Sequence, residues 1–304
     1  MGLYLGSTKI SAISFYKSGA ITPSGIFNIP SNVSQSTYDV TSYAFANGDF
    51  GYGYGRLPER ISGDISEYSN STATNIATYA FAGLNISSIS MPAVKSIGDY
   101  AFVDCTSLTS VNFPSCTSIG ASAFANCSNL TYISFPACTF INGGAFVSCS
   151  NLISANFPMC SVVNNGAFSY CRALSTISLP LILSAPQYLF YGCYSLSSVN
   201  LLSCKNIQYG AFQNCSTLSL ISLPNCSSIA TYAFYGCYYL LSLYLMSTSV
   251  VSLAAITAFT NTPISNYTTS TGGVYGSIYV PASLLASYKA ATNWTTFSDR
   301  IVGV

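Results

Sequence analysis

Residues 108–129 read LTSVNFPSCTSIGASAFANCSN, and the same pattern returns in the following 22 residues and in the blocks after them. A period this strict indicates stacked coils, each of which packs only against its neighbours. The sequence therefore predicts a solenoid, although a length of 304 residues alone would suggest about two globular domains. Phenylalanine marks the period at Phe102, Phe124, Phe146, Phe168, Phe190, Phe212 and Phe234.

The residues of one coil predict the course of the chain. In segment 108–113 the apolar side chains fall at the spacing of a short strand that pairs with its copies in adjacent coils. Pro114 lacks an N–H group, so it is expected to end that strand at a corner. The chain then returns along the other side past Cys116 to a short helical or 3-10 turn at Phe124. We predict a mainly β, right-handed, leucine-rich-repeat-type solenoid of 22-residue repeats.

The two ends of the array are predicted to be degenerate coils. Near the C-terminus the usual strand is delayed to Ile278–Val280, and Ser283 is the expected N-cap of a helix that covers the last coil. That helix is expected from the apolar spacing of Leu284, Leu285, Tyr288, Ala291 and Trp294. The expected domains are an N-terminal cap or small β module at 1–38, a degenerate repeat with a Gly/Tyr-rich insertion at 39–75, regular repeats at 76–253, and a degenerate repeat with a C-terminal helical cap at 254–304.

This register resembles the leucine-rich-repeat family, whose pattern is L-x-x-L-x-L-x-x-N/C-x-L. Segment 108–116 matches it, but the next apolar residue, Ile119, comes one position late. The repeat I-x-x-x-A-F-x-x-C-x-x-L-x-x-I-x-F/L-P is more similar to the BspA-like branch of that family, over residues 76–253. That branch is known mainly from surface proteins of anaerobic bacteria in animal hosts, so the resemblance implies adhesion or host-surface recognition. Every matched residue is a core position, and the motif therefore says little about the ligand.

Composition excludes several classes of function. Charged residues make up 6 % of the chain, the formal net charge is +1, and histidine is absent. No basic stripe can therefore neutralise a nucleic-acid backbone or an acidic membrane surface. The sequence predicts no nucleic-acid partner and no cofactor.

A membrane span is also not expected, although the mean hydropathy is +0.44. The most apolar candidate, Tyr238–Phe259, carries several Ser and Thr residues, and its large apolar residues fall where the repeat places them. Residues 1–20 lack the apolar core of a secretory signal. The expected location is nevertheless extracellular or at the cell surface. This location requires either that a signal has been removed or that the protein leaves the cell by another route.

The twelve cysteines are spaced 11 residues apart from Cys105 to Cys237, and Ile182 occupies the one position of this series that lacks a cysteine. This step is half a coil, so two columns are expected, with copies about 4.8 Å apart and side chains parallel. Disulfides need Cβ atoms that face each other, so we expect buried free thiols that act as small apolar residues. Zinc is not expected because C-x-x-C pairs and histidine are absent. Such a protein suits a reducing or oxygen-poor setting.

Catalysis is not expected, because the residues that it requires are missing from the repeats. Between Asp104 and Asp299 there is no carboxylate, and from Cys105 to Tyr288 only Arg172 and Lys205 are charged. Acid–base or nucleophilic mechanisms need a carboxylate pair or a base, so the sequence predicts a protein that is not an enzyme. The acids in the N-terminal region are expected to be solvated surface residues, among them Glu59, Asp64 and Glu67.

The outward positions of the predicted strands form an uncharged ladder of hydroxyl and amide groups. Small polar residues there are expected to satisfy one another and water, with a glycan site as the alternative. Tyr132 and Tyr244 are aromatic residues on this strand face and are secondary candidates for a binding surface.

Tyrosines gather around two of the Phe turns, in clusters expected to lie about 10 Å apart. Tyrosine among Ser, Gly and Asn is typical of adaptable recognition surfaces, while aromatic packing over the turns is an equal alternative. If the rings only pack, Phe50, Tyr52 and Tyr54 in the Gly/Tyr-rich insertion become the next candidates. The candidate surface is Tyr188, Tyr191, Tyr194, Tyr209, Tyr232, Tyr235, Tyr238 and Tyr239.

Two functions therefore remain open. One is a non-enzymatic surface recognition or adhesion protein that presents its solenoid to a protein or glycan on a host or cell surface. The other is a bacteriophage or prophage tail or fibre component, located in the virion. The missing signal, the low charge and the Ser/Thr/Tyr-rich face suit such a component, and the opening Leu3–Thr8 is a weaker resemblance to tail-associated proteins. The sequence specifies neither the ligand nor the oligomeric state.

Overall fold

The computed structural model describes residues 3–5, 8–10, 67–69, 71–267 and 269–304, which fall into two compact units. In the first unit, β1 (Leu3–Leu5) and β2 (Thr8–Ile10) pair as an antiparallel hairpin. The second unit holds the other described elements. Most of the degenerate repeat expected at 39–75 lies outside the described residues, including Phe50, Tyr52 and Tyr54.

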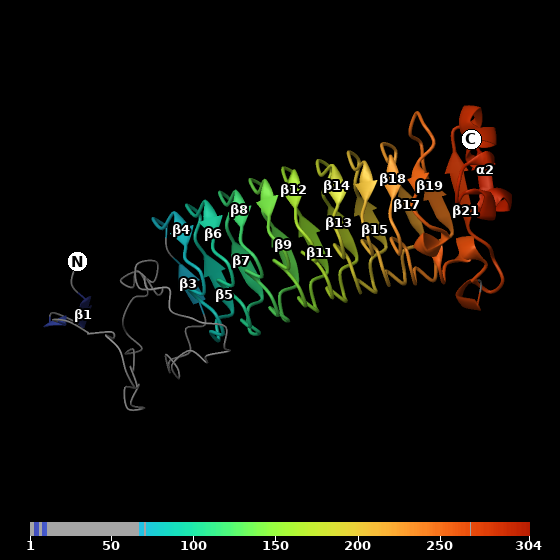
Figure 1. The fold of residues 1–304 in the computed structure, drawn as a ribbon. Helices are drawn as coiled ribbons and strands as arrows, with labels where there is room; N and C mark the ends of the chain where they lie inside the picture. Colours follow the sequence, from blue (N-terminus) through green and yellow to red (C-terminus); the bar gives the residue numbers. More distant parts are fainter. Residues whose placement is uncertain (1–2, 6–7, 11–66, 70, 268) are drawn as a thin grey trace, which may run out of the picture. The chain divides into compact units, whose positions relative to one another are not determined.

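The second unit is a solenoid with a parallel ladder of strands along each of two sides (Figure 1). The first side carries the longer strands, and each pairs in register with its copy one coil away, as Ala155 does with Ile133 and Ile177. These strands are β3 (Glu67–Ser69), β5 (Ser88–Ser90), β7 (Ser110–Asn112), β9 (Tyr132–Ser134), β11 (Ser154–Asn156), β13 (Thr176–Ser178), β15 (Ser198–Asn200), β17 (Leu220–Ser222), β19 (Ser242–Tyr244), β21 (Ser277–Val280) and β22 (Ile301–Gly303).

The second side carries two-residue strands that follow the proline corner. Each presents one buried apolar residue, such as Ile119 in β8 or Ile141 in β10, and pairs in parallel with its copies. These strands are β4 (Asn75–Ile76), β6 (Ser96–Ile97), β8 (Ser118–Ile119), β10 (Phe140–Ile141), β12 (Val162–Val163), β14 (Ser184–Ala185), β16 (Asn206–Ile207), β18 (Ser228–Ile229) and β20 (Ser252–Leu253). The predicted right-handed coil of 22-residue repeats is confirmed.

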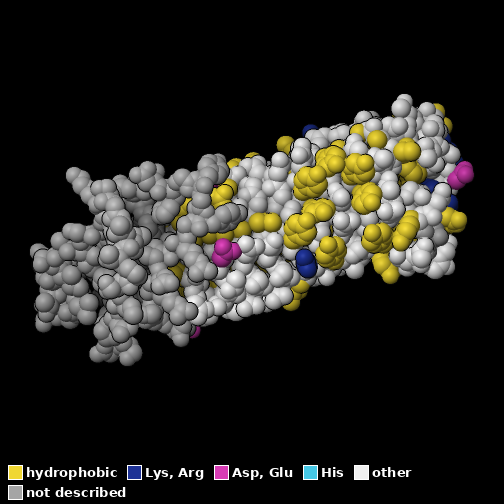
Figure 2. Space-filling model, turned by 60° about the horizontal axis from the view of Figure 1, so that its bottom comes forward, with side chains coloured by type: hydrophobic (Ala, Val, Ile, Leu, Met, Phe, Trp, Pro, Cys, Tyr) yellow, Lys and Arg dark blue, Asp and Glu magenta, His cyan; other side chains and the backbone are white. Residues whose placement is uncertain are grey.

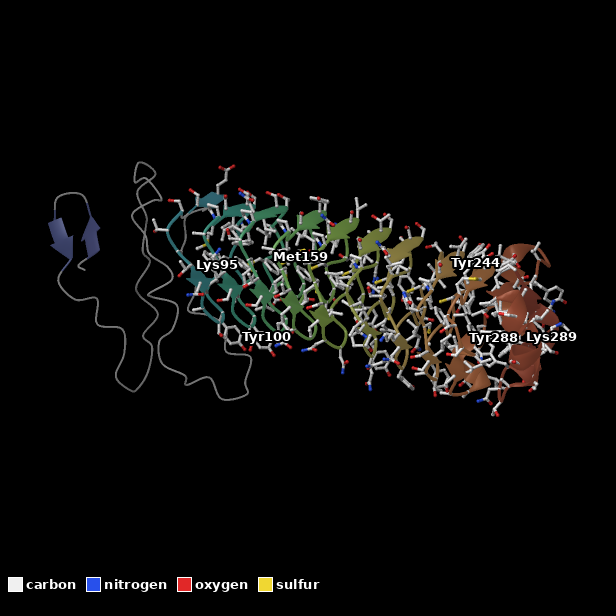
Figure 3. The ribbon with its side chains drawn as sticks, turned by 90° about the horizontal axis from the view of Figure 1, so that it is seen from above. Lys95, Tyr100, Met159, Tyr244, Tyr288 and Lys289 are labelled. Carbon is white, nitrogen blue, oxygen red and sulfur yellow. The ribbon has the colours of Figure 1, made fainter. Side chains whose placement is uncertain are left out.

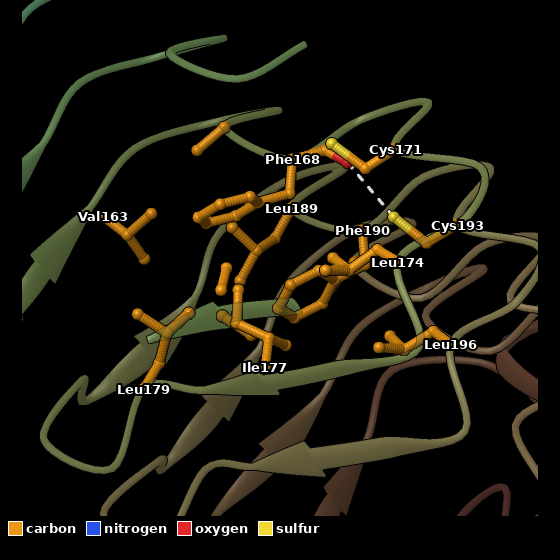
Figure 4. Close-up of a cluster of buried hydrophobic side chains, with 14 of the residues drawn as sticks. Val163, Phe168, Cys171, Leu174, Ile177, Leu179, Leu189, Phe190, Cys193 and Leu196 are labelled. Atoms are coloured by element: carbon orange, nitrogen blue, oxygen red, sulfur yellow. Dashed lines mark hydrogen bonds between the residues drawn. The ribbon is translucent and has the colours of Figure 1, made fainter. Parts of the chain in front are cut away.

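The phenylalanines of the repeat form one internal column, as predicted. Phe102 to Phe234 are fully buried, and consecutive rings lie 4.9–6.0 Å apart between centroids. A second, shorter column of Phe113, Phe135 and Phe157 packs against the first at a tilt. Figure 4 shows how Phe168 and Phe190 lie among the leucines of adjacent coils. Because each ring contacts its own copies, stacking supplies the core that one coil alone cannot close.

The segment around each phenylalanine is a run of turns that bond to the next coil. Phe124 N–H donates to the Ala145 carbonyl at 2.7 Å, and Phe146 N–H to the Ala167 carbonyl at 2.8 Å. Each turn run also contains two residues with positive φ. We name the two resulting sets the first and second turn columns. The first comprises Tyr79, Tyr100, Ser122, Gly144, Gly166, Tyr188, Gly210 and Tyr232, and the second Gly83, Asp104, Asn126, Ser148, Tyr170, Gly192, Asn214 and Gly236.

The C-terminal cap differs in detail from the prediction. The expected N-cap at Ser283 is wrong, because Ser283 lies inside the 3-10 helix η5 (Ala282–Leu284), and the N-cap of α2 (Leu285–Ala290) is Leu284 without a side-chain cap. Leu284 N–H bonds to the Pro281 carbonyl at 2.8 Å, so the proline corner starts the turn earlier than the sequence pattern indicates. Further 3-10 helices are η2 (Ile256–Phe259), η3 (Pro263–Ser265), η4 (Thr269–Thr271) and η6 (Thr295–Arg300).

The predicted cap residues nevertheless cover the last coil. Trp294 and Tyr288 are fully buried, and Trp294 donates from Nε1 to the Val251 carbonyl at 2.7 Å while the Tyr288 hydroxyl accepts from Val251 N–H. Figure 3 labels Tyr288 in the cap, beside Lys289. The strand β22, which the sequence pattern did not predict, pairs with β21 and extends the sheet. No helix in the described part of the chain is both long and apolar enough to cross a bilayer.

Candidate functional site

Five of the eight candidate tyrosines form one continuous row, whereas the sequence suggested two separate clusters. Tyr188 contacts Tyr191 at 5.6 Å and Tyr209 at 5.3 Å between ring centroids, and Tyr209 contacts Tyr232 at 5.5 Å. Each contact is edge-to-face, the arrangement that aromatic quadrupoles favour. We call the residues joined in this way the tyrosine row. It comprises Tyr170, Tyr188, Tyr191, Tyr209, Tyr232 and Tyr235.

The other candidate tyrosines lie beside the row. Tyr194 and Tyr239 are exposed, and Tyr238 packs against Tyr267 of the C-terminal insertion at 5.4 Å. Tyr170 belongs to the row but was missed by sequence analysis, because it stands alone in its coil. Its position 22 residues before Gly192, in the cluster 188–194, was the available signal. Figure 2 shows hydrophobic side chains, a class that there includes tyrosine, gathered over the C-terminal half of the described face.

Three tyrosines of the row occupy a backbone conformation that bulky residues avoid. Tyr170, Tyr188 and Tyr232 have φ values of 59°, 57° and 57°. The left-handed region costs an ordinary residue roughly 1–2 kcal/mol, which is why glycine usually fills it. In the same columns Gly192 and Gly210 do fill it, and a Cβ on Gly210 would lie 2.9 Å from the Tyr188 ring. The glycines therefore leave room for the ring of the preceding coil to lie across the turn.

Hydroxyl groups of the row interact at two places. The pKa of Tyr170 is raised, first by a side-chain hydrogen bond with Tyr191 and then by burial. The pKa of Tyr188 is raised by burial and by a side-chain hydrogen bond with Tyr209. Both shifts favour the neutral phenol of Tyr170 and Tyr188, and the two hydrogen bonds join rings of adjacent coils.

A shallow hollow of about 520 Å³ lies at the N-terminal end of the row. It arises where the first turn column has two consecutive glycines, Gly144 and Gly166, between Ser122 and Tyr188. Ser169 is buried beneath it and donates from Oγ to the Tyr188 carbonyl at 2.7 Å, which fixes the backbone under that ring. The lining residues are Gly144, Val147, Asn165, Gly166, Ser169, Tyr188, Tyr191, Tyr209 and Gln213.

The strand face behaves as the polar ladder expected from the sequence. Thr176 Oγ1 lies 3.2 Å from Ser154 Oγ, and Asn200 Nδ2 donates to Ser178 Oγ at 3.3 Å. Copies in adjacent coils thus satisfy one another. Of the secondary candidates, Tyr132 is 55 % exposed, and Tyr244, labelled in Figure 3, stacks on Tyr279 at 4.4 Å.

The cysteines form two buried columns whose thiols are hydrogen-bonded. In one column each thiol donates to the carbonyl of a phenylalanine in the preceding coil, as Cys193 does to Phe168 at 3.1 Å (Figure 4). In the other, each thiol donates to the carbonyl two residues later, as Cys138 does to Phe140 at 3.3 Å. Burial raises the thiol pKa to about 11 for Cys138 and about 12 for Cys105. These groups are therefore neutral and unreactive in the folded protein.

We expect all twelve cysteines to be free in the purified protein. Denaturing the protein without reductant in the presence of iodoacetamide should label every cysteine, and native protein at neutral pH should label hardly any, because the thiolate is the reactive form. Intact-mass spectrometry of both samples gives the number of labels. Denatured protein that lacks labels in pairs would show disulfides and contradict the parallel stacking.

Two acidic residues of the described solenoid accept hydrogen bonds from its turns. Asp99 Oδ1 accepts from Ala121 N–H at 2.6 Å, and Asp104 Oδ1 accepts from Asn126 Nδ2 at 2.7 Å. Glu67 is exposed, while Glu59 and Asp64 lie outside the described residues. Over the part of the chain that the structure describes, no cluster of three or more His, Cys, Asp or Glu side chains is placed to hold a metal ion.

Two further surface features were not anticipated from the sequence. Large apolar side chains are exposed at the corner that follows the longer strand in adjacent coils, including Met159 (Figure 3), Leu181 and Leu202. A second hollow, of about 490 Å³, lies at the C-terminal cap. Its cation, Arg300, already donates to Asn266 Oδ1 at 2.8 Å and lies 3.8 Å above the Tyr275 ring. That charge is thus engaged within the chain.

Several leucine-rich repeat proteins of known structure are similar to this chain. A leucine-rich repeat protein of Treponema pallidum shares 27 % identity, with 51 % of this chain and 79 % of that one covered and a TM-score of 0.48. A leucine-rich repeat protein of Bacteroides ovatus shares 22 % identity, with 76 % and 69 % covered and a TM-score of 0.44. A leucine-rich cell surface protein of Faecalibacterium prausnitzii shares 18 % identity, with 78 % and 91 % covered and a TM-score of 0.30.

Comparison with curated proteins gives no match. The profile of the BspA type leucine-rich repeat region matches residues 74–184 and 161–274, with 6 copies of the repeat. This match spans most of the described solenoid, including the phenylalanine, cysteine and leucine columns described above. The chain therefore belongs to the BspA-type leucine-rich repeat family.

Proposed function

We propose that this protein is a non-enzymatic recognition or adhesion protein of the cell surface, and that it binds a host protein or glycan through the tyrosine row. One observation carries the proposal. Six tyrosines form a continuous, partly exposed row, and three of them hold a left-handed backbone that glycine would adopt more cheaply. The left-handed turn itself recurs in every coil, so the distinguishing feature of the row is the unbroken contact between its rings.

The chemistry of the surroundings supports binding rather than catalysis. From Cys105 to Tyr288 the chain has no carboxylate and no histidine, so the row has no acid or base beside it. Tyrosine offers a rigid apolar ring with a polar tip, and such residues dominate binding surfaces. The strand face offers less, because its short side chains already bond one another.

Family membership favours a bacterial surface protein over a component of a phage particle. The family resemblance covers the solenoid, and one similar protein is described as a leucine-rich cell surface protein. The phage alternative rested on Leu3–Thr8 and on the low charge, and no structural observation adds to it.

Replacing Tyr191, Tyr235 and Tyr238 together with Ser tests the proposal. None of the three has positive φ, so the exchange changes no strained backbone position. We expect attachment of the purified protein to cultured epithelial cells to weaken by at least about tenfold. The melting temperature should stay nearly unchanged, because the three rings are only half-buried and none belongs to the core.

The matched control is Tyr132→Ser, which removes an exposed ring from the strand face. It should leave attachment unchanged. If the triple variant still binds but melts earlier, the rings serve packing alone, and the proposed function at this surface is wrong.

A further inference from the structure

We propose that the hollow at Gly144 and Gly166 is a binding site for a neutral pyranose sugar. This inference rests on the proposed recognition function and specifies the ligand class for one end of the tyrosine row. The hollow has a volume of about 520 Å³, which lies within the range of about 300–1,000 Å³ found for small-molecule sites.

The hollow combines a glycine floor with aromatic walls. The consecutive glycines remove side chains at two positions of the first turn column, where Tyr79, Tyr100, Tyr188 and Tyr232 carry rings in other coils. Tyr188 and Tyr191 stand at 75° to each other and so present both a ring edge and a ring face. A pyranose has an apolar C–H face that packs on an aromatic ring, whereas its rim is polar.

The polar groups of the lining match the rim of a sugar. Asn165 is exposed and Gln213 is half-buried, and each amide can both donate and accept, as sugar hydroxyls do. The tyrosine hydroxyls add further donors and acceptors. Ser169 is buried, and its hydroxyl already donates to the Tyr188 carbonyl. Its role is therefore to fix the backbone that carries the Tyr188 ring.

The lining also discriminates against charged ligands. None of the side chains around the hollow carries a formal charge at neutral pH. A sulfated or acidic saccharide, a phosphate or an acidic peptide would lose hydration without gaining a counter-charge. The hollow is shallow, so we expect dissociation constants in about the millimolar range for a single sugar unit and tighter binding for multivalent display.

The column itself supplies a substitution that fills the hollow. Tyr79 and Tyr100 are consecutive members of the first turn column, and their rings stack at 4.9 Å. Gly166→Tyr would place a ring before Tyr188 in the same way, in a backbone conformation that Tyr188 holds in the next coil. Tyr188→Ser removes a wall instead. Tyr100→Ser is the matched control, because Tyr100 and Tyr188 occupy the same column and are both 37 % exposed.

The test is binding of the full chain to lactose, N-acetyllactosamine, maltotriose, sialyllactose and a heparin hexasaccharide, measured by titration NMR. We expect at least one neutral sugar to bind, with affinity reduced more than about tenfold in Gly166→Tyr and Tyr188→Ser and changed less than about twofold in Tyr100→Ser. Circular dichroism and the melting temperature verify that each variant is folded.

Three outcomes overturn the inference: no neutral sugar binds, the charged sugars bind better, or folded Gly166→Tyr binds as well as the parent chain. Failure of the sugar site is distinguishable from failure of the proposed function. If no sugar binds but the triple tyrosine variant loses cell attachment, the row recognises a protein. If the triple variant still attaches to cells, the proposed function itself is wrong.

Discussion

Replacing Phe146 with Ala is expected to lower the free energy of unfolding by about 3–5 kcal/mol, the usual loss for a buried aromatic residue. Phe146 is fully buried and lies between Phe124 at 5.2 Å and Phe168 at 5.3 Å, with Phe135 and Phe157 also in contact. The cavity would face two coils at once, because the column runs through the middle of the stack. Denaturant unfolding followed by circular dichroism measures the loss.

Tyr132→Ala is the control for this prediction, since it removes an aromatic ring from the surface of a nearby coil. We expect its effect to stay within about 0.5 kcal/mol. A loss below about 1 kcal/mol for Phe146→Ala would mean that the coils collapse around the gap, and that the column contributes less than its burial indicates.

Alkaline pH is expected to unfold the solenoid over a narrow range. Burial raises the pKa of the folded thiols to about 11 for Cys204 and about 12 for Cys226, against an ordinary value of 9.0. The protonated form is therefore favoured in the folded state. This stability is complete below about pH 9 and is lost as the pH rises toward the folded values, because the unfolded thiols ionise first.

The expected size of this effect follows from the number of thiols. Each contributes a slope of about 1.4 kcal/mol per pH unit, and twelve buried thiols together give up to about 16 kcal/mol per unit. That exceeds the total stability of a typical domain, so unfolding should occur between about pH 9 and 11. Denaturant titrations at a series of pH values, with reductant present, give the slope directly.

A variant with fewer thiols shows whether alkaline unfolding comes from ionisation of the cysteines or from ionisation of the tyrosines. Cys116→Ala, Cys138→Ala and Cys160→Ala together remove three of the twelve buried thiols. The slope of stability against pH should fall by about a quarter, even though the lost side chains also lower stability at neutral pH. A slope that does not depend on the number of thiols would contradict the explanation.

The core was predictable from the sequence because its contacts are between copies of the same residue. Phe124 packs against Phe102 and Phe146, so a fixed spacing in the sequence becomes a neighbour in space. The same holds for the paired strands, in which Ile133 lies beside Ala155. Ser283 was misjudged because a cap depends on where the preceding turn begins, and Pro281 sets that point.

The surface was harder to predict because it depends on how one coil differs from the next. Tyrosine in a left-handed conformation is rare, so nothing in Tyr170 or Tyr188 alone indicates that its ring lies across the next turn. The hollow was also missed, since glycine is common in turns. An alignment of the repeats on their 22-residue period would have revealed the hollow, because Gly144 and Gly166 then precede Tyr188 in one column.

The constant register of the columns has a genetic consequence. A duplication or deletion of 22 codons anywhere between Leu108 and Leu240 would keep the phenylalanine, leucine and strand columns in line. Unequal recombination between repeats could therefore lengthen or shorten the protein without loss of its core. The same event at Gly144–Gly166 would erase or double the hollow, so such rearrangements would generate variation in binding while the fold is inherited unchanged.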